Sequence, residues 1–139
     1  MEEAVLYVVE NNLATITMNR PKSLNSMNDG LIDGLHAALD KAVADAEVRA
    51  IVLTGNGKAF CAGGDLSYLN GLNGTAEKKS FIARVGDVAK RITTIEKPVI
   101  AWVNGVTAGA GVNLMLACDL IYASGKARFG ERFAKVGLI

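Results

Sequence analysis

The sequence predicts an α/β fold in which a mostly parallel sheet is flanked by helices. After two β-rich segments at the start, apolar runs typical of buried strands alternate with segments whose apolar residues recur every three or four positions. Elements in this order pack as helices on a largely parallel sheet with right-handed crossovers. The 139 residues, half of them hydrophobic, are enough for a real core, so we expect residues 1–139 to form one domain.

The first two strands are predicted at Val5–Val9 and Leu13–Met18. The short segment between them contains Asn11 and Asn12, which is typical of a hairpin turn. A loop is expected at Asn19–Asn25, because Pro21 disfavours a helix there.

The first helix is predicted to begin at Ser26, since Ser26 with Asp29 three residues later resembles a capping box. Its apolar stripe has the spacing of an amphipathic helix and consists of Leu31, Leu35, Leu39, Val43 and Ala46. A strand follows at Val48–Thr54, and Ala59–Asp65 is expected to be a loop of small residues.

A helical turn is expected at Leu66–Leu69. Thr75 is a candidate N-cap for a second helix, which ends before Lys97-Pro98. The apolar positions of this helix are Phe81, Val85, Val88, Ile92 and Ile95.

The remaining segments are centred on a glycine-rich junction. A buried strand at Val99–Val103 turns through glycines into a buried helix at Leu114–Cys118. Another buried strand is predicted at Leu120–Ala123, and the last segment is Glu131–Leu138.

Two loops of small residues, Cys61–Asp65 and Asn104–Leu114, each follow a predicted strand. The carboxyl ends of parallel strands lie at one edge of a sheet, where ligands bind. Two backbone N–H groups that converge there would form an oxyanion hole for a carbonyl oxygen. The glycines could equally serve only close packing of helix on sheet, and the residues alone leave both interpretations open.

Composition excludes several function classes. The net charge of +1, without clustered Lys and Arg, argues against nucleic acid as a partner. The longest apolar run, Ala108–Cys118, is too short to span a membrane. Cys61 and Cys118 form no C-x-x-C motif, and the start lacks a signal-peptide pattern, so we expect a reducing, cytoplasmic location.

Cofactor and metal chemistry are also disfavoured. His36 is the sole histidine and is interpreted as a surface or boundary residue, which leaves neither a catalytic triad nor a set of metal ligands. Gly109 and Gly111 match a dinucleotide fingerprint, but Leu114 replaces its third glycine, and the acidic ribose ligand is missing. We therefore expect no metal and no cofactor.

The motifs taken together resemble the enoyl-CoA hydratase/isomerase (crotonase) superfamily over nearly the whole chain. The residues that carry this resemblance, in the family's order, are Asn19–Asn25, Thr54–Leu66, Lys97–Ala101, Asn104–Asp119, Ala127–Gly130 and Val136–Ile139.

The resemblance implies repeated ββα units, a trimer or a dimer of trimers, and an acyl-CoA substrate, with coenzyme A being part of that substrate rather than a cofactor. It assigns the oxyanion hole to the N–H groups of Gly64 and Ala110, although the second position is usually glycine. Residues expected to contact the coenzyme or substrate are Lys22, Leu24, Ala62, Gly63, Asp65 and Leu66.

The acid–base residues depart from the family's pattern. The two glutamates of the hydratases fall on Asn113 and Phe133, neither of which serves as a general base. Asn113 could position substrate or water, but a buried, hydrogen-bonded side chain is the expected role. The isomerase branch places its single acid two residues beyond Ile139, and Glu131 is the nearest carboxylate, a candidate acid unless it lies on the surface.

The chain ends on the apolar residues Val136–Ile139, and the resemblance predicts about as much chain again, so we expect a truncated form lacking part of the site. Enoyl-CoA isomerisation is the favoured function. The alternatives are a hydratase with non-standard acid–base residues and a non-catalytic acyl-CoA-binding fragment.

Overall fold

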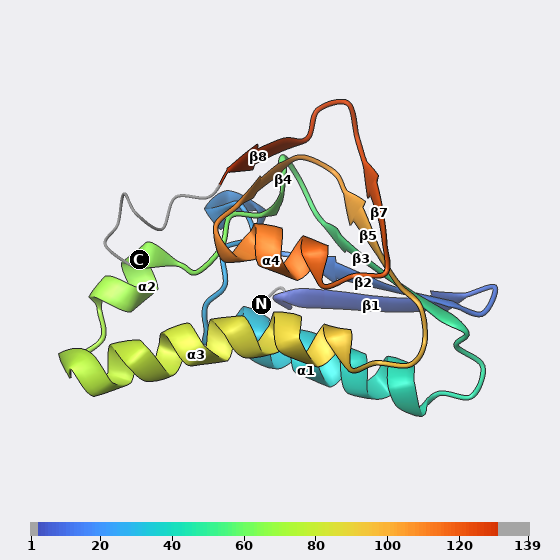
Figure 1. The fold of residues 1–139 in the computed structure, drawn as a ribbon, viewed down its shortest axis with the longest axis horizontal. Coiled ribbons are helices and arrows are strands. Elements are labelled where there is room, and N and C mark those ends of the chain that lie inside the picture. Colours follow the sequence, from blue (N-terminus) through green and yellow to red (C-terminus); the bar gives the residue numbers. More distant parts are fainter. Residues whose placement is uncertain (1–2, 131–139) are drawn as a thin grey trace.

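The structure is a computed structural model that describes residues 3–130. Its larger sheet has five strands in the order β1-β2-β3-β5-β7 (Figure 1). These strands are β1 (Val5–Glu10), β2 (Leu13–Met18), β3 (Ala50–Gly55), β5 (Val99–Val103) and β7 (Leu120–Ala123). β1 pairs with β2 in antiparallel fashion and all other neighbours are parallel, which confirms the predicted hairpin and the mostly parallel sheet.

A second, three-stranded parallel sheet was not predicted. It has the order β4-β6-β8. Its strands are β4 (Ala59–Cys61), β6 (Val106–Ala108) and β8 (Arg128–Gly130). Two of these strands, β4 and β6, lie in segments that were predicted to be loops of small residues. The expectation was wrong because a three-residue strand is too short to show alternation of apolar and polar side chains.

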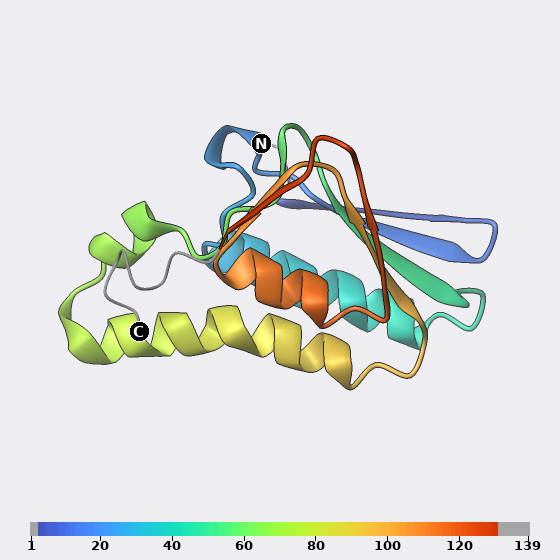
Figure 2. The ribbon, with the colours of Figure 1, turned by 45° about the horizontal axis from the view of Figure 1, so that its top comes forward.

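The helices are α1 (Asp29–Ala44), α2 (Leu66–Asn70), α3 (Gly74–Thr93) and α4 (Ala110–Leu116). In Figures 1 and 2, α1 and α3 run alongside each other, on the same side of the five-stranded sheet as α4. The sheet residues that face these helices are fully or almost fully buried, and they include Ile16, Ile51, Leu53, Val99 and Ala101. The predicted α/β arrangement is therefore confirmed.

The apolar faces of the two long helices were predicted in large part. Leu31, Leu35 and Leu39 of α1 are buried, as are Phe81, Val85, Val88 and Ile92 of α3. At the end of the predicted α1 stripe, however, Val43 is exposed and Ala46 lies beyond the helix.

Both predicted N-caps were wrong. The N-cap of α1 is Asn28, whose side-chain oxygen accepts the N–H of Leu31 at 3.0 Å, and not Ser26. The N-cap of α3 is Asn73, so that Thr75 lies inside the helix. Asn and Ser are nearly equal as caps, so the residue type alone does not choose between Ser26 and Asn28, whereas at α3 the ranking of Asn above Thr favours the observed cap.

Two further expectations need correction. Pro21 does not exclude a helix, because Pro21–Ser23 forms a 3-10 turn with proline at its first position, where no N–H is needed. β7 was expected to be buried, yet all four of its residues are exposed. It is the last strand of its sheet in residues 3–130 and has a neighbour on one side only.

His36 lies at the α1–α3 boundary, as predicted, where a guanidinium nitrogen of Arg91 lies 3.2 Å from its Nδ1. Arg91 also pairs with Asp40 of α1, and Arg84 pairs with Asp33 at 2.6 Å. Arg84 pairs with Asp29 of α1 as well, so three ion pairs join α3 to α1. Within residues 3–130, no helix has both the length and the apolar character needed to cross a membrane.

Candidate active site

Pairing of the two shortest strands brings the small-residue loops together. β4 and β6 are parallel neighbours, with Ala59 opposite Val106 and Cys61 opposite Thr107. The chain leaves both strands at the same edge of the small sheet. It continues into Ala62–Asp65 on one side and into Gly109 and the start of α4 on the other.

Gly63 is the point of contact between the two loops. Its φ is +99°, a conformation that favours glycine. A Cβ atom at Gly63 would lie 3.0 Å from the carbonyl oxygen of Ala108 and 3.2 Å from the amide nitrogen of Ala110. Glycine is therefore required both by the backbone angle and by the close approach of the second loop.

The N–H groups of Gly64 and Ala110 donate to no acceptor within residues 3–130. The neighbours of Gly64 are bound to Met27: Met27 N–H donates to Gly63 O at 2.6 Å, and Asp65 N–H donates to Met27 O at 2.9 Å. These two hydrogen bonds fix the peptide planes around Gly64 without using its N–H. Ala110 is the first residue of α4, where helical N–H groups have no partner within the helix.

A second glycine, Gly111, allows α4 to pack closely against the small sheet. A Cβ atom at Gly111 would lie only 2.1 Å from the carbonyl oxygen of Cys61, so no other residue fits without displacement. Cys61 is fully buried, and burial raises the pKa of its thiol to about 12 although the Gly63 N–H favours the thiolate. Its thiol is therefore structural and is not a nucleophile at neutral pH.

The loop at residues 19–27 lies against this site. The Asn25 side chain donates to Ala59 O at 2.9 Å, and Ala62 N–H donates to Leu24 O at 3.0 Å. Lys22 and Leu24 are exposed on this loop, as is Leu66 at the start of α2. The structure thus brings Leu24 into contact with Ala62, while Lys22 lies at the solvent-facing edge.

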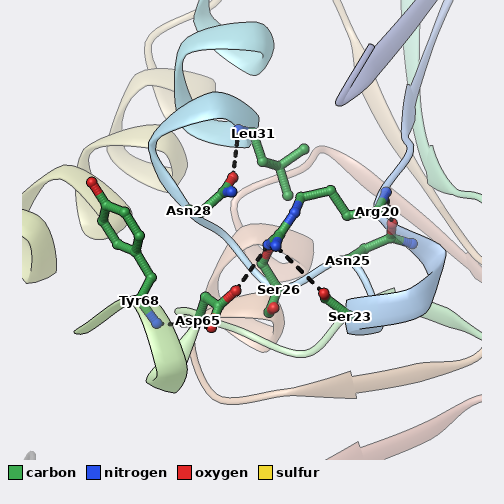
Figure 3. A network of polar contacts seen from close by, with 8 residues as sticks. All are labelled: Arg20, Ser23, Asn25, Ser26, Asn28, Leu31, Asp65 and Tyr68. Carbon is green, nitrogen blue, oxygen red and sulfur yellow. Dashed lines mark hydrogen bonds and ion pairs between the residues drawn. The ribbon is translucent and has the colours of Figure 1, made fainter. Parts of the chain in front are cut away.

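Asp65 is held through its side chain, a role that sequence reasoning missed (Figure 3). Its carboxylate accepts from Tyr68 N–H at 3.1 Å, which caps α2, and pairs with Arg20 at 3.1 Å. Although partial burial opposes ionisation, the bonds from Tyr68 N–H and Arg20 lower the pKa of this carboxyl below its usual range. Arg20 also donates to Ser26 O at 2.6 Å within the 19–27 loop, and its pair with Asp65 joins that loop to the Ala62–Asp65 loop.

The acid–base candidates are not brought together. Asn113 was expected to be buried, but it is exposed on α4, one turn after Ala110. That expectation was wrong because α4 buries the face that carries Gly111, Leu114 and Met115 instead. Glu131 and Phe133 lie outside the described residues.

Side chains of α3 border Gly64, and the sequence gives no direct signal for this. A Cβ atom at Gly64 would lie 3.7 Å from Val85 Cγ2 and 3.9 Å from Phe81 Cε2. The Phe81 ring also packs against Tyr68, with ring centroids 5.0 Å apart. Within residues 3–130, no group of three His, Cys, Asp or Glu side chains is placed to hold a metal ion.

Known proteins are similar to this chain in sequence. The chain is 38% identical to a short-chain-enoyl-CoA hydratase of Clostridium acetobutylicum over 135 residues, which cover 96% of this chain and 51% of that protein. It is 39% identical to the 1,2-epoxyphenylacetyl-CoA isomerase of Escherichia coli over 143 residues, which cover 100% of this chain and 54% of the relative. The chain spans about half the length of these curated relatives.

The fold agrees with solved structures at the same coverage. An enoyl-CoA hydratase of Bacillus anthracis superposes with a TM-score of 0.92 at 30% identity, over 98% of this chain and 53% of that one. The family model described as enoyl-CoA hydratase/isomerase matches residues 9–139. The chain therefore belongs to the enoyl-CoA hydratase/isomerase family.

Proposed function

We propose that this site polarises the thioester carbonyl of an acyl-CoA through the N–H groups of Gly64 and Ala110. Each hydrogen bond to that oxygen strengthens as the carbonyl becomes an enolate, so the pair stabilises the transition state more than the bound substrate. The observation that carries the proposal is the contact of Gly63 with Ala110. The N–H groups of Gly64 and Ala110 have no acceptor in residues 3–130, and this contact joins the two loops that carry them.

The coenzyme would lie along the 19–27 loop. The Ala62–Leu24 hydrogen bond joins that loop to the start of the Ala62–Asp65 loop, and exposed Lys22 would supply a positive charge for phosphates. Asp65 would act indirectly, because its carboxylate is bound to Arg20 and to the α2 cap. Its part is to hold the Gly64 peptide in place.

Double-bond isomerisation is the reaction we propose, in which a general base takes a proton from one carbon of the enoyl group and then, as the conjugate acid, returns it to another carbon. The resemblance puts that acid–base group two residues beyond Ile139. Hydration requires a general base that activates water, and Asn113, exposed one turn beyond Ala110, has no such capacity. The enolate formed against Gly64 and Ala110 would be common to both reactions. The supporting observation for isomerisation is thus the amide at position 113.

Gly64→Pro in the protein at its natural length tests the proposal. Proline removes the Gly64 N–H, yet it leaves the Met27 hydrogen bonds to Gly63 and Asp65 available. We expect turnover of a 3-enoyl-CoA to fall by about 100-fold, the cost typical of one oxyanion donor. Unchanged turnover contradicts the proposal.

Gly125→Pro is the matched control. Ala127 N–H donates to Ser124 O at 3.0 Å, which places Gly125 at the second position of a four-residue turn. Proline is favoured there, so this variant introduces the same residue without removing a donor from the site. It is expected to keep full turnover.

Hydration is the second candidate, because hydratase names occur among the relatives alongside the isomerase name. Water addition to crotonyl-CoA is the direct assay. Hydration that disappears in Asn113→Ala would favour this candidate. Binding of an acyl-CoA without any turnover would instead favour a non-catalytic acyl-CoA-binding role.

A further inference from the structure

The Cα of Gly64 faces two side chains of α3. Phe81 and Val85 are the side chains nearest to the position of a Gly64 Cβ atom, at 3.9 and 3.7 Å. The opposite side of this loop is joined to residues 24 and 27 by backbone hydrogen bonds. An acyl group whose carbonyl oxygen meets the Gly64 N–H, with its coenzyme on the 19–27 side, would therefore extend toward Phe81.

Phe81 is firmly placed. Its side chain is only 4% exposed, and its ring packs against Tyr68. Two hydrogen bonds position Tyr68: its N–H donates to Asp65, and its hydroxyl donates to Asp29 at the start of α1.

Asp29 joins the three helices around this ring. Its carboxylate accepts from Tyr68 of α2 and pairs with Arg84 of α3, which also pairs with Asp33 at 2.6 Å. Arg84 lies one turn after Phe81 on α3 and directly before Val85. The Asp29 contacts therefore fix both residues that face Gly64.

The space beside Phe81 bears on how far an acyl chain could extend. A cavity of about 170 Å³ lies there, lined by Asp29, Tyr68, Leu72, Glu77, Ser80, Phe81 and Arg84. Most of these side chains are polar or charged. A long alkyl chain would have to displace Phe81 and then desolvate the Asp29–Arg84 ion pair, which costs free energy.

We propose that Phe81 limits the length of the acyl group that the site accepts, and that Arg84, through Asp29, is the positioning residue that keeps Phe81 against Gly64. The inference rests on the proposed function and specifies its substrates as short acyl-CoA thioesters.

The test compares kcat/KM for enoyl-CoA substrates of six and twelve carbons, using the protein at its natural length. The unaltered protein is expected to favour the six-carbon substrate by at least about tenfold. Phe81→Leu is expected to raise the twelve-to-six-carbon ratio by about tenfold, mainly through a lower KM for the longer substrate. Equal use of both substrates, or a ratio that Phe81→Leu leaves unchanged, overturns the inference and leaves the proposed function standing.

Arg84→Met is the second variant. Arg84 is part-exposed, so this substitution is expected to disturb folding less than Phe81→Leu, and it tests the inference if Phe81→Leu folds poorly. It should raise the same ratio, and Arg84→Lys should partly restore it. Arg91→Met is the matched control, because Arg91 makes an equivalent α3–α1 ion pair two turns farther from Gly64. A ratio that Arg84→Met and Arg91→Met change equally contradicts the positioning role. If no acyl-CoA binds to the unaltered protein, the proposed function fails as well.

Discussion

Gly63 lies so close to Ala110 that a Cβ atom on Gly63 would stand 3.2 Å from the Ala110 amide nitrogen. These residues are 47 positions apart in the sequence, and the pairing of β4 with β6 brings them together. The contact determines where the two proposed oxyanion donors lie relative to each other. Several consequences can be measured.

Gly63→Ala should destabilise the fold and suppress acyl-CoA turnover. A non-glycine residue at φ +99° is strained, and its Cβ would press on Ala108 O and Ala110 N. We expect a loss of about 2–3 kcal/mol in the free energy of unfolding, measured by urea denaturation. Gly74→Ala is the control, because Gly74 has φ +80° but no atom within 4 Å of its Cβ position. A loss no greater for Gly63→Ala than for Gly74→Ala would refute the contact.

Gly111→Ala and Gly86→Ala should have opposite effects on stability. The first substitution places a Cβ 2.1 Å from Cys61 O and must push α4 away from β4, at a cost of about 3 kcal/mol. The second lies inside α3 in open space, where alanine gains about 0.5–1 kcal/mol over glycine. Thermal unfolding followed by circular dichroism separates the two. A shift of the same sign in both variants would contradict this packing.

Asp65 should make the stability depend on pH in the acid range. Its folded-state pKa is lowered, so its contribution is complete above the unfolded pKa of about 4 and is lost as pH falls through the folded value. Asp65→Asn keeps a capping side chain but loses the Arg20 ion pair, and should cost about 1–2 kcal/mol at pH 7.

The difference between the two proteins is expected to begin to shrink as pH falls below about 4, where Asp65 of the unfolded chain binds a proton, and to vanish as pH falls through the lower folded-state pKa. Urea denaturation at a series of pH values measures it. Asp87→Asn, at an exposed position of α3, serves as the control. A difference that is the same at every pH would argue against an ionised Asp65.

Both thiols should resist modification in the folded protein. Burial raises the pKa of Cys61 and that of Cys118 to about 12, with Asp119 adding to the effect at Cys118. Ellman's reagent at pH 8 is expected to react slowly when the protein is folded and to titrate both thiols in guanidinium. Rapid reaction of either thiol in the native state would contradict the described packing.

Much of the fold could be predicted from the sequence because its signals are local. Alternating residues mark β2, three- and four-residue spacing marks α1 and α3, and a continuous apolar run marks β5. The three-residue strands β4 and β6 carry no such signal, since their positions depend on each other and on close contacts at glycines.

The candidate site was predictable only in part. The resemblance indicated Gly64 and Ala110, and the structure places their loops in contact. The link from Asp65 to Arg20 spans 45 residues, and the Asp29–Arg84 pair spans 55, so no spacing rule could find either. The exposure of Asn113 depends on which face of α4 meets the core, and a seven-residue helix of mostly small and apolar residues gives little indication of that face.

The central claim is that Gly64 and Ala110 polarise a thioester carbonyl. The most direct measurement is the infrared carbonyl band of an acyl-CoA labelled with ¹³C at the thioester carbon, free and bound to the protein at its natural length. Two hydrogen bonds to the oxygen predict a shift to lower frequency on binding, and a smaller shift in Gly64→Pro. A bound carbonyl that absorbs at the frequency of the free thioester would contradict the account.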